Sequence, residues 1–98
     1  MSRSTLHSTT QPLALTRIED SGHSWLLVPM DYLRALGIES KISPYSYRSG
    51  DLAYLEEDCD YPLFETAADN AGWELSIDER FIDGLCFVRD LPQYRRSR

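Results

Sequence analysis

Short apolar stretches separated by turn residues run along most of this chain. Leu13–Ile18 alternates weakly between apolar and polar positions, and Ser24–Val28 is a second apolar stretch beyond the turn residues Glu19–Gly22. Alternation with a period of two residues is typical of strands, and a run of Glu, Asp, Ser and Gly is typical of a turn. Residues 13–28 are therefore predicted to form a β-hairpin.

A short helix is predicted directly after this hairpin. Pro29 suits the first turn of a helix, and Met30, Leu33 and Leu36 follow at helical spacing. Gly37 is a typical residue just beyond a helix C-terminus. A helix of about two turns is marginal alone, so packing must hold it in place.

The same order of elements follows in the second half of the chain. Arg48–Asp51 is a strong turn signal between the apolar stretches Ile42–Tyr47 and Leu52–Leu55. Residues 43–56 are therefore predicted to form a second hairpin, with Tyr45 and Tyr47 on one face of its first strand.

A second helix is predicted beyond this hairpin, capped by Asp58 or Asp60 and with Pro62 in its first turn. Its buried face is predicted to consist of four apolar residues, Leu63, Phe64, Ala67 and Ala68. Asn70–Gly72 is expected to end it. Two further strands, at residues 73–77 and 85–88, are predicted around the turn residues Asp83 and Gly84.

The predicted fold class is α+β, with the element order ββαββαββ in a single small domain. We expect one antiparallel sheet with two short helices on one face. The predicted domain covers residues 13–92, between a flexible N-terminal tail at residues 1–12 and a basic C-terminal tail at residues 93–98.

Composition limits the kind of protein that this chain can be. It has 98 residues, of which 42% are hydrophobic and 27% charged, as expected for one globular domain. No apolar run approaches the roughly 18 residues of a membrane span, and the N-terminus lacks the apolar region of a secretory signal. We therefore predict a cytoplasmic protein, not bound to membranes, in which Cys59 and Cys86 are free thiols.

Charge is distributed unevenly along the chain. All 16 acidic residues lie between Glu19 and Asp90, where there are only five basic residues, so this span has a net charge of −11. Ten acids and no base occur between Asp51 and Glu79. A surface of this sign repels phosphate, so the domain is not expected to bind nucleic acid directly.

The run Glu56–Asp60 permits three interpretations. Its acids can lie at the end of a strand and favour the N-terminus of the following helix. They can form an acidic surface that binds a partner. They can also collect a hard cation such as Ca²⁺ or Mg²⁺, although the spacing is not that of an EF-hand loop. We predict no metal or other cofactor, since the chain has no zinc pattern, phosphate-binding loop or dinucleotide fingerprint.

His23 and Cys59 are each considered as candidates for a catalytic role. His23 can act as an acid or base with Glu19 or Asp20, although a lone histidine near carboxylates is common by chance. A helix N-terminus lowers the pKa of a thiol, whereas the carboxylates around Cys59 raise it. No nucleophile motif surrounds either residue, and the sequence favours a protein without catalytic activity.

Tyrosine is frequent for a chain of this length, with six residues. Tyr45, Tyr47 and Tyr54 can form an exposed stripe of the kind that serves recognition. They can equally cover the helix side of the sheet, as their β-propensity allows.

Three segments together resemble a group of small, uncharacterised bacterial proteins that occur on phages, prophages and plasmids. These segments are His23–Pro29, Ile42–Tyr47 and Ala53–Asp60. The pattern in the group is His-Gly-x-Leu-x-Val-Pro, then Ser-x-Tyr-Ser-Tyr, then Tyr-Leu-Glu-Glu-Asp-Cys-Asp, and this chain has Ser24 where the group has glycine. The resemblance covers about residues 22–65. It implies a mobile-element or host-adaptation gene and implies no activity.

The leading hypothesis is a small acidic module that binds a basic partner protein. One form of it is an inhibitor whose acidic surface imitates DNA and occupies the basic groove of a nucleic-acid-binding protein. The candidate partner-binding residues are Asp51, Glu56, Glu57, Asp58, Asp60, Glu65 and Asp69, supported by Tyr47 and Tyr54. One alternative is a small enzyme or metal-dependent protein that uses His23 and the acids of residues 56–60. Another is a homodimer without catalytic activity, self-complementary through a sheet edge or a tyrosine face.

Overall fold

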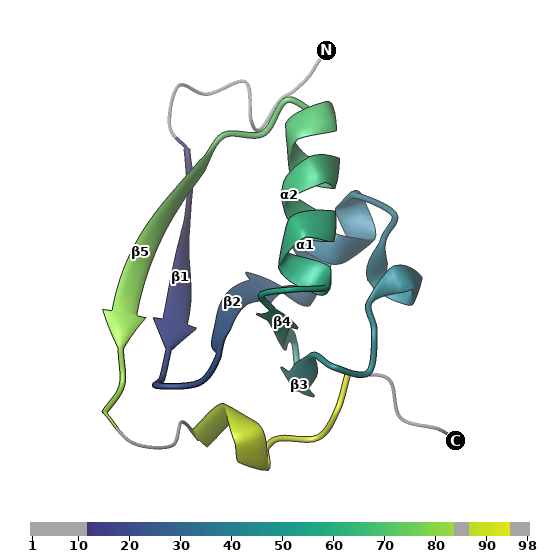
Figure 1. Ribbon diagram of the computed structural model, residues 1–98. Coiled ribbons are helices and arrows are strands. Elements are labelled where there is room, and N and C mark those ends of the chain that lie inside the picture. The colour runs from purple at the N-terminus through teal and green to yellow at the C-terminus, as the bar shows by residue number, and fades with distance from the viewer. Residues whose placement is uncertain (1–11, 84–86, 95–98) are drawn as a thin grey trace.

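Five strands form one sheet in the computed structural model, which describes residues 12–83 and 87–94. The strands lie in the order β3-β4-β2-β1-β5 (Figure 1). Their bounds are Leu13–Glu19 for β1, Ser24–Pro29 for β2, Tyr47–Ser49 for β3, Leu52–Glu56 for β4 and Leu75–Phe81 for β5. The α+β fold predicted from the sequence is confirmed.

Both predicted hairpins are present. β1 and β2 pair antiparallel, as do β3 and β4, and β2 joins the two hairpins through an antiparallel ladder with β4. The turn between β3 and β4 contains Gly50 at a φ of 60°, a left-handed conformation in which glycine is not strained. The local pattern of apolar and turn residues therefore identified both hairpins.

The two predicted helices are also present, at Met30–Ala35 (α1) and Asp60–Asn70 (α2). Pro62 lies in the first turn of α2, as expected. The predicted cap is wrong, because Cys59 occupies the N-cap position and makes no side-chain capping bond. Asp60, the first residue of the helix, directs its carboxylate elsewhere, to the loop before β3.

The prediction of a purely antiparallel sheet is wrong. β5 lies at the edge beside β1 and runs parallel to it, so the sheet is mixed. α2 forms the crossover that returns the chain to the end of the sheet where β1 begins, and the Leu13 N–H donates to the Glu74 carbonyl at 2.8 Å. A parallel pair requires a long connection of this kind, which local patterns do not reveal.

The final predicted hairpin is also wrong. β5 begins two residues later than predicted and extends to Phe81. Residues 84–86 lie outside the described part, whereas Phe87–Asp90 forms a short 3₁₀ helix, η3, instead of the end of a strand. Val88 is fully buried there, because η3 packs on the face of the sheet opposite the α-helices.

β3 is shorter than predicted and begins at Tyr47. Residues 39–41 form a second 3₁₀ helix, η2, and the Ser46 N–H donates to the Ser43 carbonyl in the turn that follows. This segment is folded into a turn because Asp60 accepts hydrogen bonds from both serines. Tyr45 therefore lies in a turn and not on a strand.

Apolar residues form a cluster on each face of the sheet. The larger one joins the helix residues Met30, Leu33 and Phe64 to the inward side chains of β1, β2 and β4. α1 and α2 therefore cover the same face, as predicted. The smaller cluster, on the opposite face, contains Ile18, Trp25, Tyr54 and Val88.

A buried ion pair attaches η3 to the turn between β1 and β2. Arg89 donates through Nε and Nη2 to the carboxylate of Asp20 at 3.0 and 3.1 Å, and the Asp20 side chain is 0% exposed. The same carboxylate accepts the N–H groups of Gly22 and His23 at 2.9 Å. The Arg89 guanidinium also lies 5.5 Å from the centre of the Trp25 ring.

Gln93 and Tyr94, which were predicted to belong to the basic tail, are attached to the domain. Gln93 bridges to Tyr47, and the Tyr94 hydroxyl donates to the Glu39 carbonyl at 2.6 Å. Residues 1–11 and 95–98 of the predicted tails lie outside the described part. Among the described residues, no helix has the length and apolar character needed to cross a membrane.

Replacing Arg89 with methionine should lower the free energy of unfolding by about 3 kcal/mol, because the buried Asp20 carboxylate loses its countercharge. Urea denaturation followed by circular dichroism measures this change. Arg34→Met is the matched control, since Arg34 pairs only with exposed carboxylates, and it should cost less than about 1 kcal/mol. Equal losses in the two variants would contradict the structural role given to Arg89.

Candidate functional site

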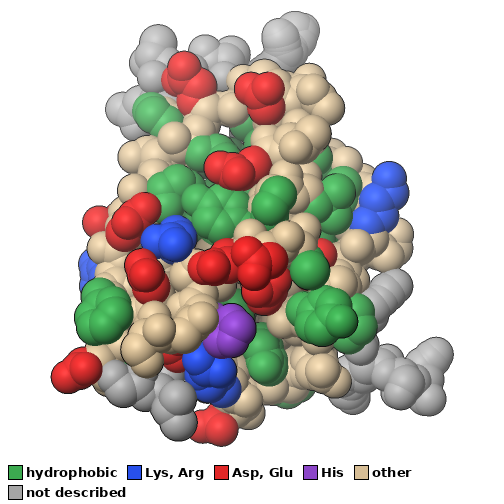
Figure 2. Space-filling model, viewed as in Figure 1, with side chains coloured by type: hydrophobic (Ala, Val, Ile, Leu, Met, Phe, Trp, Pro, Cys, Tyr) green, Lys and Arg blue, Asp and Glu red, His purple; other side chains and the backbone are tan. Residues whose placement is uncertain are grey.

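The acidic residues proposed from the sequence do not form one uniform surface. Figure 2 shows acidic side chains on one face of the molecule, several of them around a patch of apolar side chains. The structure divides them among an acidic groove, a second hollow, a buried site and an exposed turn. Each of these environments gives its carboxylates a different role.

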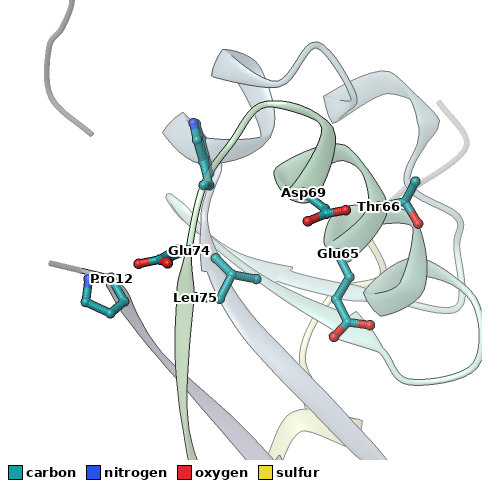
Figure 3. Close-up of a pocket in the computed structure, with 7 residues that line it drawn as sticks. Pro12, Glu65, Thr66, Asp69, Glu74 and Leu75 are labelled. Atoms are coloured by element: carbon teal, nitrogen blue, oxygen red, sulfur yellow. The ribbon is translucent and has the colours of Figure 1, made fainter. Parts of the chain in front are cut away.

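The acidic groove lies between α2 and the start of β5. It has a volume of about 730 Å³ and is lined by Pro12, Glu65, Thr66, Asp69, Trp73, Glu74 and Leu75. Figure 3 shows Glu65 and Asp69 on α2, across the opening from Glu74 and Leu75. Of the described residues that line the groove, three are acidic and none is basic, so its lining combines a negative potential with apolar side chains.

Further charged groups lie next to this groove on β1 and β5. Arg17 lies 3.5 Å from the Glu79 carboxylate, 3.3 Å from Glu19 and 3.9 Å from Glu57. Burial and then the carboxylate of Glu65 raise the pKa of the Tyr61 phenol, and Arg17 opposes this shift. The three carboxylates that pair with Arg17 are therefore distinct from those that line the groove.

A second hollow brings His23 together with the acids that follow β4. It has a volume of about 330 Å³ and is lined by His23, Trp25, Tyr45, Tyr47, Glu56, Asp58, Cys59 and Arg89. This is the concave arrangement that a small enzyme using these residues would need. Neither Glu19 nor Asp20, the carboxylates predicted to act with His23, lines the hollow, and Asp20 is instead bound to Arg89.

The carboxylates at this second hollow disfavour the thiolate form of Cys59. Partial desolvation, then the carboxylate of Glu56 and those of Asp60 and Asp58, raise the pKa of the exposed Cys59 thiol. A higher pKa leaves less of the reactive thiolate at neutral pH. In the part of the chain that the structure describes, no three His, Cys, Asp or Glu side chains are arranged to hold a metal ion.

Asp60 lies inside the domain and not on its surface. It is 3% exposed and accepts bonds from the Ser43 N–H at 3.0 Å, the Ser43 hydroxyl at 2.6 Å and the Ser46 hydroxyl. Ser46 in turn accepts the Glu56 N–H at 2.9 Å. Asp60 therefore organises the loop before β3 and is not accessible to a partner.

Asp51, Glu56 and Glu57 each have a separate local environment. Asp51 is exposed in the turn between β3 and β4, and it lines neither hollow. Glu57 is half-buried and accepts a hydrogen bond from the Ser24 hydroxyl. Glu56 accepts the N–H groups of Asp58 and Cys59, both at 3.0 Å, so it also shapes the loop before α2.

The three tyrosines do not form a single stripe. Tyr54 is 7% exposed and packs edge-on against Phe87, on the face opposite the α-helices. Tyr47 is half-buried against Trp25, with 6.4 Å between ring centres. Tyr45 is 67% exposed at the rim of the second hollow. The alternative that these rings cover the helix side of the sheet is also wrong, because Tyr47 and Tyr54 pack in the cluster on the opposite face.

Trp73, Glu74 and Leu75 were not predicted as site residues, although they form one wall of the acidic groove. They belong to the segment predicted as a strand, and only the crossover of α2 places them opposite Glu65 and Asp69. The only feature of the sequence that pointed to these residues was the stretch from Asp51 to Glu79, which contains them and has no basic residue.

Comparison with models of known protein families found no match to this chain, and comparisons with curated proteins and with solved structures found none. The resemblance of residues 22–65 to proteins of mobile elements therefore stays an expectation from the sequence.

Replacing Asp60 with asparagine should lower the free energy of unfolding by about 2 kcal/mol, because the amide presents N–H groups to hydroxyl and backbone donors. Thermal and urea denaturation measure the change. Asp58→Asn, at an exposed neighbouring position, should change stability by less than about 0.5 kcal/mol. If the two variants are equally stable, Asp60 does not have the structural role described.

The raised pKa of Cys59 should make this thiol react with iodoacetamide more slowly than free cysteine at about pH 8. Glu56→Gln removes a neighbouring negative charge, so it should lower the thiol pKa and increase the rate. Mass spectrometry of the alkylated peptides reports Cys59 separately from Cys86. Glu74→Gln is the control, and an equal rate increase in that variant would contradict the assignment to Glu56.

Proposed function

We propose that this chain is a protein-binding module that holds a basic segment of a partner in the acidic groove between α2 and β5. The observation that carries the proposal is the composition of this groove. Glu65, Asp69 and Glu74 surround a hollow of about 730 Å³, and no described residue that lines it is basic. A lysine- or arginine-rich segment supplies the missing positive charge.

Apolar side chains in the wall of the groove add to this electrostatic contribution. Trp73 and Leu75 line the hollow and are only half-buried, so they keep apolar area that a partner can cover. Attraction between exposed charges mainly increases the rate of association and selects partners by sign. Burial of aromatic and aliphatic surface then supplies affinity. The partner segment should therefore combine basic with apolar residues.

The concave shape of the groove differs from the protruding surface that DNA mimicry requires. A DNA mimic presents its carboxylates on a surface that enters a basic groove of the partner, as the phosphate backbone does. Here Glu65, Asp69 and Glu74 line a hollow in this chain, which suits a segment entering it. DNA mimicry remains a narrower form of the proposal, in which the partner is a nucleic-acid-binding protein and DNA competes for its site.

A triple variant tests the proposal. Glu65→Gln, Asp69→Asn and Glu74→Gln together remove three charges from the groove and should weaken partner binding about tenfold or more. Partners are captured from bacterial lysate at about 50 mM salt, identified by mass spectrometry and titrated as purified proteins. Binding by the unmodified chain should weaken steeply at about 500 mM salt, because the Debye length shortens.

The matched control removes three exposed acids elsewhere, with Asp31→Asn, Glu39→Gln and Asp51→Asn. This variant has the same net charge as the triple variant, because both lose three carboxylates. Its groove stays intact, because the three residues line neither hollow. It should bind nearly as tightly as the unmodified chain. If both variants lose binding equally, net charge and not the groove determines affinity, and the proposal fails.

A photo-crosslinking residue at Thr66, within the groove, identifies the partner segment directly. It should label a segment that contains both basic and apolar residues, whereas the same group at the exposed Ser40 should label it weakly. Equal labelling from both positions would overturn the placement of the partner in the groove. Displacement of the partner by duplex DNA would support the DNA-mimic form, and simultaneous binding of DNA would exclude it.

A further inference from the structure

The outer edge of β5 provides a second interaction surface, separate from the acidic groove. β5 is the last strand of the sheet, and no described strand pairs with its outer side. Its residues beyond Ile77 are exposed, and Phe81 retains 65% of its accessible surface. An edge of this length presents unpaired N–H and C=O groups that can bind another strand.

The pairing with β1 determines which backbone groups of β5 are available. The Ile82 N–H donates to the Glu19 carbonyl at 2.8 Å, and the Glu74 carbonyl accepts from Leu13 at 2.8 Å. Because backbone groups of successive residues point to alternate sides of a strand, the even-numbered residues of β5 point toward β1. Ile77, Glu79 and Phe81 therefore direct their N–H and C=O groups away from the sheet.

We propose that β5 pairs antiparallel with β5 of a second copy of this chain, so that Asp78 of each copy faces Arg80 of the other. A two-fold axis at Glu79 produces this register. Asp78 and Arg80 then occupy the positions without backbone hydrogen bonds, where facing side chains are closest. Ile77 of each copy faces Phe81 of the other and covers part of its exposed ring.

The charges on β5 select this register over its neighbours. A shift of the axis to residue 78 places Asp78 opposite Asp78 of the second copy, and a shift to residue 80 places Arg80 opposite Arg80. Like charges at such close positions are unfavourable. In the proposed register Glu79 faces Glu79 of the second copy. Each of these two carboxylates already lies 3.5 Å from Arg17 of its own chain, which offsets their repulsion.

Within one copy, Asp78 and Arg80 already form an exposed pair at 3.0 Å. Their side chains are 64% and 68% exposed, so both can also reach a facing strand. Exposed pairs of this kind contribute little to monomer stability. Replacing the pair within each chain by pairs between the two chains therefore costs little free energy. The interface is narrow, so the dimer should dissociate on dilution.

Charge reversal tests the register in the full-length chain. Asp78→Arg and Arg80→Asp should each raise the dimer dissociation constant roughly tenfold, measured by analytical ultracentrifugation, because like charges then face one another. The double variant restores opposite charges and should dimerise like the unmodified chain. An equal mixture of the two single variants should form a heterodimer, since each supplies the charges that the other lacks.

Amide hydrogen exchange provides a second measurement that does not depend on any variant. Protection of the Ile77, Glu79 and Phe81 amides should increase with protein concentration, whereas that of Asp78 and Arg80 should not change. A protein that stays monomeric up to about 1 mM would overturn the proposal. So would a double variant as weak as the single ones, or outer-edge amides protected at every concentration, which would show that another segment of the same chain occupies the edge.

Discussion

The carboxylate of Asp60 is the group on which much of the architecture depends. A buried carboxylate must receive hydrogen bonds, and Asp60 obtains them from Ser43 and Ser46. Because of this requirement, residues 43–46 form a turn, β3 begins only at Tyr47, and the first residue of α2 is held in place. Ser46 extends the network to the Glu56 N–H at the end of β4 and, through its carbonyl, to the Tyr94 N–H. One side chain thus connects the start of α2 and the end of β4 to the last described residues.

A second buried carboxylate, Asp20, organises the opposite face of the sheet. Its pairing with Arg89 holds η3 against the sheet, so that Val88 of η3 packs in the cluster with Trp25 on the face that the two α-helices leave open. The two buried carboxylates differ in the groups that donate hydrogen bonds to them. Asp20 has a cation, whereas Asp60 is bound by hydroxyl and backbone donors. Both are therefore satisfied, and neither contributes to the negative surface that a partner would meet.

The crossover through α2 determines where interactions can occur. It places Glu65 and Asp69 opposite the start of β5, which forms the acidic groove, and it carries the chain past the sheet so that β5 becomes an edge strand. The groove and the edge therefore arise from the same topological feature. They use different residues, however, since the groove ends near Leu75 and the proposed strand pairing is centred on Glu79. A dimer formed through β5 would leave two acidic grooves available.

Elements with local signals could be predicted from the amino-acid pattern alone. The turn residues and apolar alternation identified both hairpins, and the spacing of Met30, Leu33 and Leu36 identified α1, because these patterns reflect backbone geometry over a few residues. Charge counting likewise indicated an acidic surface. The folded chain was needed to show that β5 pairs parallel with β1, that Asp60 is buried while Glu65 is exposed, and that Glu74 completes the groove. These outcomes depend on contacts between residues far apart in the chain. An aspartate or glutamate is the same letter in the sequence whether its carboxylate faces a partner or accepts a hydrogen bond from a buried serine.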